Sequence, residues 1–194
     1  MTASFPALTS IEGAPVPQEV YHCRIVPTVV LKSREPMDFL YTSGKAGRYN
    51  LSSMPCIYGA EDQATAGAES ERYRKGRTVS LTTYWIKVTG DLLDLGDAKV
   101  LKALQFTPEE LYAPWRGLST QGPTKTQLLG QAVAESGRFC GIRFPADAAK
   151  QRGFSGYNVV IFREGVKAPW SVVVSNDQGE EVSRWPELQT FFQF

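Results

Sequence analysis

The chain has 194 residues, 42% of them hydrophobic, and its 21 lysines and arginines nearly balance its 20 aspartates and glutamates. This length suits a single domain with a core of its own. The near-neutral composition is typical of a globular protein and argues against direct binding of nucleic acid. No apolar run approaches the roughly 20 residues of a membrane span, and no secretory signal is recognisable, so we expect a cytoplasmic protein without a membrane partner.

Metal chemistry finds no support in the sequence. Cys23, Cys56 and Cys140 are far apart and flanked by apolar or aromatic residues, which predicts buried thiols in a reducing compartment. His22 is the only histidine, and no cysteine or histidine pair has the spacing of metal ligands. We therefore expect catalysis, if any, to depend on carboxylates, hydroxyls and arginines.

The N-terminal region is expected to differ from the rest of the chain. Prolines and small polar residues in residues 1–18 predict an extended arm, and residues 19–194 are predicted to form one domain. The first strand is expected over residues 20–26, before Pro27, and residues 29–32 are a possible extension of it.

Residues 33–53 are interrupted by prolines and glycines, which predicts a loop, the usual place for binding groups. A short apolar strand follows over residues 56–58, and alanines with two leading acidic residues predict a helix over 61–74. Gly67 inside that helix costs about 1 kcal/mol relative to Ala. Either close helix–strand packing or the approach of a ligand would explain this glycine.

The middle of the chain alternates between strand and helix signals. We predict a strand over residues 78–88, a turn over 91–95 and a helix over 97–104. Thr107 and Pro108 predict the start of a short helix, and another helix is expected from Thr124 to Gly137.

The last third is rich in strand signals, over residues 141–144, 158–162, 171–175 and 181–185. Strands at both ends with helices in the middle predict an α+β fold with a mixed sheet. Four basic residues at 72, 74, 75 and 77 follow the helix over 61–74, where the helix dipole favours positive charge. They also allow a nucleic-acid binding hypothesis, which the near-neutral net charge disfavours.

Three side chains from neighbouring segments suit the binding of a dinucleotide. Arg48 offers a planar fork that matches phosphate oxygens, and Tyr58 offers a ring for stacking. Glu69 offers an anion that can accept a hydrogen bond from a ribose hydroxyl and stabilise an oxocarbenium-like transition state. Residue types alone are weak evidence, because many chains of this size contain such a triple.

The order and spacing of these residues resemble the RES domain, a family named for its Arg, Glu and Ser. Members carry a Gly-Arg-aromatic-Asn loop, then a strand ending in Tyr and a helix bearing Glu, at the intervals that separate Arg48, Tyr58 and Glu69 here. The likeness covers roughly residues 20–163 and continues in segments 91–95, 126–130 and 141–145.

The resemblance implies a compact fold similar to ADP-ribosyltransferase toxins, acting on NAD as its substrate. It implies cleavage of the nicotinamide–ribose bond by hydrolysis, phosphorolysis or transfer of ADP-ribose to a protein. Many members are toxins of toxin–antitoxin pairs, so an antitoxin covering the site is a possible partner. By resemblance, Arg48 holds the NAD phosphates, Tyr58 stacks near nicotinamide with Tyr49 lining the same pocket, and Glu69 stabilises the ribosyl cation.

This chain departs from the family at the serine. The expected position follows Pro145, where the chain has Ala146, and Ser155 is the nearest substitute for contacting the ligand. Three hypotheses therefore stay open: an NAD glycohydrolase or phosphorylase, a mono-ADP-ribosyltransferase, and a degenerate module that keeps the fold without catalysis.

Overall fold

A computed structural model describes residues 5–12, 14–15, 21–28, 45–74, 80–118 and 122–186. The strands are β1 (Ala14–Pro15), β2 (Tyr21–Pro27), β3 (Cys56–Ala60), β4 (Leu81–Thr89), β5 (Asp91–Asp94), β6 (Gly141–Pro145), β7 (Tyr157–Phe162), β8 (Ser171–Ser175) and β9 (Glu181–Trp185). The helices are α2 (Gln63–Arg74), α3 (Ala98–Ala103), α4 (Pro108–Tyr112), α5 (Trp115–Leu118), α6 (Lys125–Ser136) and α7 (Asp147–Gln151), with 3-10 turns η1 (Pro6–Thr9) and η3 (Arg163–Gly165).

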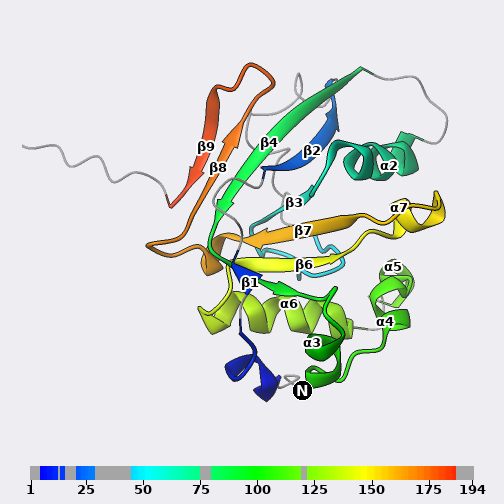
Figure 1. Cartoon of the computed structure of the whole chain (residues 1–194), viewed down its shortest axis with the longest axis vertical. Helices are drawn as coiled ribbons and strands as arrows, with labels where there is room; N and C mark the ends of the chain where they lie inside the picture. Colours follow the sequence, from blue (N-terminus) through cyan, green and yellow to red (C-terminus); the bar gives the residue numbers. More distant parts are fainter. Residues whose placement is uncertain are drawn as a thin grey trace, which may run out of the picture.

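Within the described part of the chain, nine strands form one curled sheet in the order β1-β5-β6-β7-β3-β2-β4-β8-β9. The pair β5–β6 is parallel, and the other described pairs are antiparallel. Figure 1 shows α3, α4, α5 and α6 on one side of β5 and β6, with α7 and α2 near the end of the sheet where β7 begins. The predicted α+β class with a mixed sheet is confirmed.

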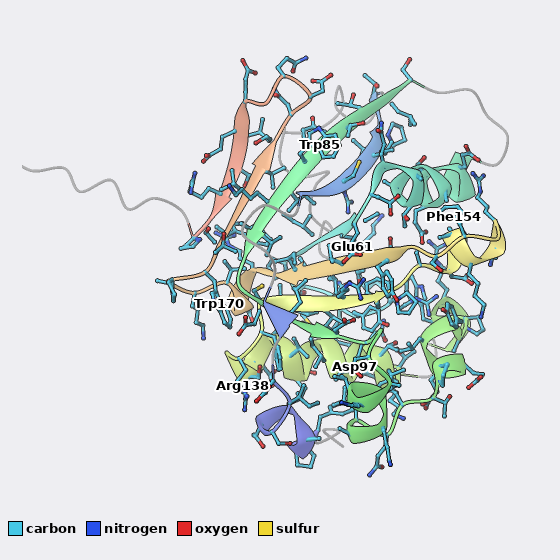
Figure 2. All side chains as sticks on the ribbon, viewed as in Figure 1. Glu61, Trp85, Asp97, Arg138, Phe154 and Trp170 are labelled. Atoms are coloured by element: carbon cyan, nitrogen blue, oxygen red, sulfur yellow. The ribbon has the colours of Figure 1, made fainter. Side chains whose placement is uncertain are left out.

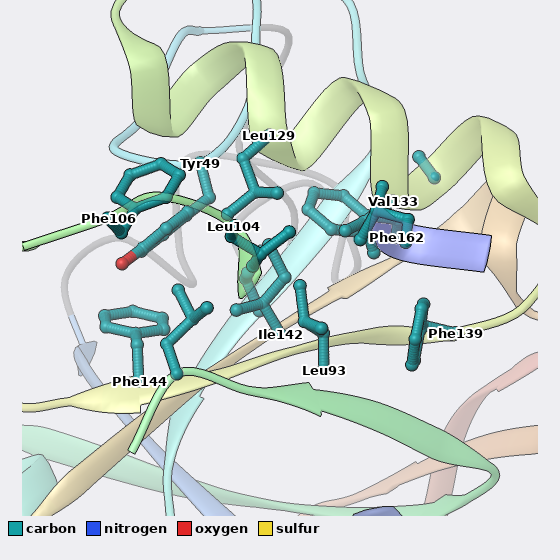
Figure 3. Packing of buried hydrophobic residues seen from close by; sticks show 14 of the residues in the cluster. Tyr49, Leu93, Leu104, Phe106, Leu129, Val133, Phe139, Ile142, Phe144 and Phe162 are labelled. Carbon is teal, nitrogen blue, oxygen red and sulfur yellow. The ribbon is translucent and has the colours of Figure 1, made fainter. Parts of the chain in front are cut away.

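Two hydrophobic clusters fill opposite faces of the sheet. One contains Leu129 and Val133 of α6 together with Ile142 and Phe162 of the sheet, all essentially inaccessible to solvent (Figure 3). The other face buries mainly β-branched residues of the sheet. A third, smaller cluster joins Ala66 of α2 to strands β2 and β3. The cores therefore fix α6 and α2 over different parts of the sheet.

Helix boundaries follow the capping signals in the sequence. Thr107 and Thr124 each form a capping box, in which the threonine side chain and the third helical residue satisfy backbone N–H groups reciprocally. Gly137 ends α6 with φ at 65°, a left-handed conformation that glycine adopts without steric cost. The predicted helix starts at residues 107 and 124 and the stop at Gly137 are confirmed.

Several predicted elements need correction. Residues 91–94 form strand β5 rather than a turn, because Leu92 and Leu93 are buried on opposite faces of the sheet between β1 and β6. The helices α5 and α7 carry no strong sequence signal and were not predicted. The expected extension over residues 29–32 lies outside the described residues, as do residues 78–79 of the predicted fourth strand.

The described part of the predicted N-terminal arm packs against the domain. Leu8 and Ile11 belong to the α6-side core, and β1 pairs with β5. Arg138, after α6, donates hydrogen bonds to the backbone carbonyls of Thr9 and Ile11 (Figure 2). This differs from the extended arm expected from composition, while the domain boundary at residue 18 stays a prediction.

No helix among the described residues is long and apolar enough to cross a bilayer.

The loop before β3 is fixed against α6. Gln127 of α6 donates a hydrogen bond from Nε2 to the Gly47 carbonyl at 2.8 Å. Gly130, one turn later, lies so close to the Tyr49 carbonyl that a Cβ at this position would overlap it. The position of the loop therefore depends on a helical glycine, which is otherwise an unfavourable residue in a helix.

We predict opposite effects for alanine at the two helical glycines. Gly130→Ala should lower the free energy of unfolding by about 1–3 kcal/mol, because the added methyl overlaps the Tyr49 carbonyl. Gly67→Ala is the matched control: no described atom lies within 4 Å of the position that an added methyl would take, so it should raise stability by about 1 kcal/mol. Urea unfolding of both variants checks this, and equal effects would contradict it.

Candidate active site

Strand β3 and the helix that follows it bring two predicted site residues to one face of the sheet. Tyr58 and Ala60 are two residues apart on β3 and so share a face. Ala60 lies directly opposite Asn158 in the antiparallel β3–β7 pair, which places Asn158 on that face as well. Asn158 donates a hydrogen bond from Nδ2 to Oε1 of Glu69 on α2 at 2.8 Å. Tyr58 and the Glu69 carboxylate therefore lie on the same side of the sheet.

The Tyr58 hydroxyl connects the sheet to the loop at residues 47–50. It accepts a hydrogen bond from the Tyr49 backbone N–H and donates one to Asn50 Oδ1, both at 3.0 Å. Desolvation raises the pKa of Tyr58 well above its ordinary value, and the nearby positive charge of Arg48 acts in the opposite direction. The hydroxyl is thus a protonated structural group, which leaves the ring as the part of Tyr58 suited to stacking.

The Arg48 guanidinium contacts the described backbone through one of its three nitrogens. Its Nη1 donates to the carbonyls of Leu111 and Ala113, at 2.5 and 3.0 Å, where α4 ends. Its Nε and Nη2 make no hydrogen bond to any residue that the structure describes. Arg48 is partly exposed, so these two groups retain the planar donor edge that suits a phosphate.

Glu69 is partly exposed on α2 and is held from one side only. Its Oε1 accepts the Asn158 hydrogen bond, while Oε2 makes no hydrogen bond within the described ranges. Asn158 could not be predicted as a site residue, because an asparagine at the start of a predicted strand carries no chemical signal until the strand pairing is known.

Tyr49 lies in the core beneath α6. Its side chain is fully buried, and its ring centroid lies 4.5 Å from that of Phe144 (Figure 3). Burial raises the pKa of Tyr49, and its hydroxyl has no hydrogen-bond partner among the described residues. Tyr49 therefore supports the site through packing and through its backbone N–H, and its predicted place in a ligand pocket stays a prediction.

The position expected to carry the family serine is the N-cap of α7. Ala146 has the extended backbone conformation of an N-cap, with φ at −85° and ψ at 115°, but its side chain makes no capping bond. Its backbone N–H donates to the Gly156 carbonyl at 2.8 Å, so the exposed Ser155 lies one residue from this contact. Figure 2 labels Phe154 at the same turn. A ligand-binding role for Ser155 stays a prediction.

The opposite face of the sheet carries a charged cluster that fixes the start of α2. Arg143 forms a bidentate pair with Glu61, at 2.5 and 3.0 Å, and also contacts Asp94 at 3.0 Å (Figure 2). Its guanidinium lies 3.4 Å from the ring centroid of Tyr157. Burial disfavours its charge, but the two carboxylates outweigh this and raise the pKa of Arg143. Since Glu61 directly follows β3, this cluster restrains the segment that leads to Glu69.

A hollow of about 270 Å³ lies elsewhere, between the loop after Asn50 and α6. It is lined by Leu51, Ser52, Ser53, Met54, Gln131, Ala134, Glu135 and Glu164. Its charged lining residues are both acidic, so it is poorly suited to the phosphates of a dinucleotide. The candidate active site is the separate set of Arg48, Tyr58 and Glu69.

No group of three or more His, Cys, Asp or Glu side chains is arranged for metal binding among the residues that the structure describes. The three cysteines are buried and free of disulfides. Burial raises the pKa of the Cys23 thiol to about 11 and that of Cys140 to about 12, so both stay protonated at neutral pH. The prediction of buried thiols is confirmed.

Comparison with known protein families identifies the class of protein. The model of the RES domain family matches residues 24–184, and the chain therefore belongs to the RES domain family. The match extends beyond residue 163, where the resemblance seen in the sequence ended. None of the curated proteins matches the chain significantly.

A solved structure shares the fold. The chain is similar to one in the crystal structure of the M. tuberculosis MbcT–MbcA toxin–antitoxin complex, with a TM-score of 0.58 and 19% sequence identity. The similar region covers 81% of this chain and 80% of that chain. At this identity the comparison establishes the fold.

Tyr58→Phe should destabilise the protein by about 1–3 kcal/mol, because it leaves the Tyr49 N–H and Asn50 Oδ1 without their shared partner. Tyr112→Phe is the control, since the Tyr112 hydroxyl makes no hydrogen bond to a described residue. Chemical denaturation measures both variants, and a Tyr58→Phe protein as stable as the control would contradict the linking role of this hydroxyl.

Proposed function

We propose that this protein cleaves the bond between nicotinamide and ribose in NAD, by hydrolysis or phosphorolysis, as the toxin of a toxin–antitoxin pair. Membership of the RES domain family supports NAD as the substrate. The likeness to a chain of a toxin–antitoxin complex supports the toxin role and an antitoxin partner. We propose that this antitoxin covers the site. The observation that carries the proposal is the Glu69 carboxylate, held by Asn158 on the sheet face that also bears Tyr58.

The reaction needs a fixed negative charge. When the glycosidic bond breaks, its electron pair leaves with nicotinamide, whose ring nitrogen becomes neutral, and positive charge develops on the ribose. A carboxylate about 4 Å from that charge stabilises it more in a partly buried site than in water. Water or phosphate then supplies the oxygen that bonds to the ribose carbon. Glu69 fits the role of this anion.

The other two residues fit binding roles. The Nε and Nη2 groups of Arg48 can hold the NAD phosphates while Nη1 stays on the backbone carbonyls of Leu111 and Ala113. The Tyr58 ring, fixed through its hydroxyl, offers a surface on which nicotinamide can stack. The site would therefore be positioned before the substrate arrives, which lowers the cost of binding.

The products identify the reaction. Purified protein is incubated with NAD with and without phosphate, and nicotinamide and the ribose-containing product are quantified. Free ADP-ribose indicates hydrolysis, and a phosphorylated ADP-ribose formed only with phosphate indicates phosphorolysis. Label from NAD on a protein band in lysate indicates the alternative, a mono-ADP-ribosyltransferase. Absence of nicotinamide release under all these conditions would contradict the proposed chemistry.

Glu69→Gln should lower kcat for nicotinamide release by about 100- to 1,000-fold, because it removes the anion without changing side-chain size. Glu71→Gln is the matched control on the same helix. Glu71 is exposed and ion-paired with Arg152, so its loss should leave turnover within about twofold of the wild-type rate. Equal turnover of the two variants would exclude Glu69 as the critical anion.

Ala146 favours a second candidate, a module that binds NAD or a partner without catalysis, since the family serine is missing there. Ala146→Ser should stabilise the protein by about 0.5–2 kcal/mol, because a serine hydroxyl can cap the N–H groups of α7. If the missing hydroxyl is the reason for inactivity, the variant gains nicotinamide release that the wild type lacks. An active wild type would rule out the non-catalytic alternative.

A further inference from the structure

The amide of Asn158 contacts the carboxylate that the proposed reaction needs. Its Nδ2 lies 2.8 Å from Glu69 Oε1, and the two residues are 89 positions apart in the sequence. Strand β7 is an inner strand, with Phe144 of β6 on one side of Asn158 and Ala60 of β3 on the other. The donor therefore comes from backbone that is hydrogen-bonded to both neighbours, where it has little freedom to move.

The acceptor side is restrained as well. Asp62 accepts hydrogen bonds from the backbone N–H and the hydroxyl of Thr65, both at 2.7 Å, which fixes the first turn of α2. Gly156 leaves no space for a side chain against Thr65, so helix and turn are in close contact. The hydrogen bond between Asn158 and Glu69 thus joins two fixed parts of the protein.

An amide is chemically suited to orient a catalytic carboxylate. Arginine or lysine at this place would pair with the carboxylate and offset the charge that stabilises a cation. A neutral amide fixes one oxygen and leaves the carboxylate its full charge. Because Asn158 occupies Oε1, the other oxygen, Oε2, stays available to the ribose.

We propose that Asn158 is the positioning residue of this enzyme, which orients Glu69 so that Oε2 faces the ribose while its negative charge is preserved. The inference rests on the proposed function and adds a residue to its site. A purely structural tie between α2 and the sheet would use the same hydrogen bond. A positioning role predicts that variants of Asn158 lower kcat with little change in KM, and that Asn158→Asp, the isosteric change, loses more activity than Asn158→Ala. A purely structural role predicts that the isosteric change is the milder one.

The experiment compares Asn158→Ala and Asn158→Asp for nicotinamide release from NAD. Asn158→Asp keeps the shape but replaces the donor with a second carboxylate beside Glu69, whereas Asn158→Ala removes the whole amide and adds no charge. We expect kcat to fall by about 10- to 100-fold in Asn158→Ala, with KM within about threefold, a loss comparable to that of an orienting group behind a catalytic ligand. Asn158→Asp should lose more, despite its closer fit, because like charges at this distance repel.

Asn176→Asp is the control. Asn176, in the turn between β8 and β9, donates to a carboxylate oxygen of Glu180 at the same distance, 2.8 Å, but lies far along the sheet from Glu69. Its variant should keep kcat within about twofold of the wild-type value. Far-ultraviolet circular dichroism and thermal melting establish the folded fraction of every variant, and rates are compared per folded molecule.

The outcomes separate this inference from the proposed function. Loss of kcat at nearly constant KM, larger in Asn158→Asp than in Asn158→Ala, supports the positioning role. An active wild type with Asn158 variants of unchanged kcat overturns the inference and leaves the proposed function intact. A milder loss in Asn158→Asp than in Asn158→Ala also overturns it, since packing alone would then explain the effect. A wild type that releases no nicotinamide overturns the proposed function, and the inference with it.

Discussion

The antiparallel pairing of β3 with β7 is the constraint on which the rest of the site depends. Its register sets Ala60 opposite Asn158 and so places Tyr58 on the same face as the amide that meets Glu69. A shift by one residue would turn Asn158 to the opposite face and separate it from α2. The Glu69 helix follows β3 after two residues, and the Arg143–Glu61 pair fixes that junction. Strand register and helix position are therefore determined together.

Much of this fold could be predicted from the sequence, because the signals are local. The threonines that cap α4 and α6 predict those helices, because their capping hydrogen bonds form within one turn of the chain. Alternating and β-branched residues announce the C-terminal strands in the same way. The order Arg48, Tyr58, Glu69 was recognisable because a family likeness gave meaning to intervals that chemistry alone leaves ambiguous.

What could not be predicted depends on pairings between distant segments. Asn158 and Arg143 are ordinary strand residues in sequence, and they acquire partners only when β3, β6 and β7 lie side by side. Strand β5 was mistaken for a turn because its burial on both faces comes from neighbours that the sequence does not identify. The hydrogen bonds of Arg48 could not be predicted for the same reason, because the carbonyls that it binds lie more than 60 residues away in the sequence.

The contacts of the Arg48 guanidinium link the binding of an anion to the rigidity of the segment at the end of α4. Arg48 donates hydrogen bonds from Nη1 to backbone carbonyls at the C-terminal end of α4, and its other two nitrogens are suited to bind an anion. An anion bound to those nitrogens would immobilise the Arg48 side chain. The hydrogen bonds from Nη1 to the Leu111 and Ala113 carbonyls would then cost less conformational entropy. Thermodynamic linkage is reciprocal. A partner protein that orders this segment would therefore raise the affinity for the anion by the same factor by which the anion raises the affinity for that partner. Occupancy of the site and rigidity of α4–α5 are then coupled variables of one equilibrium.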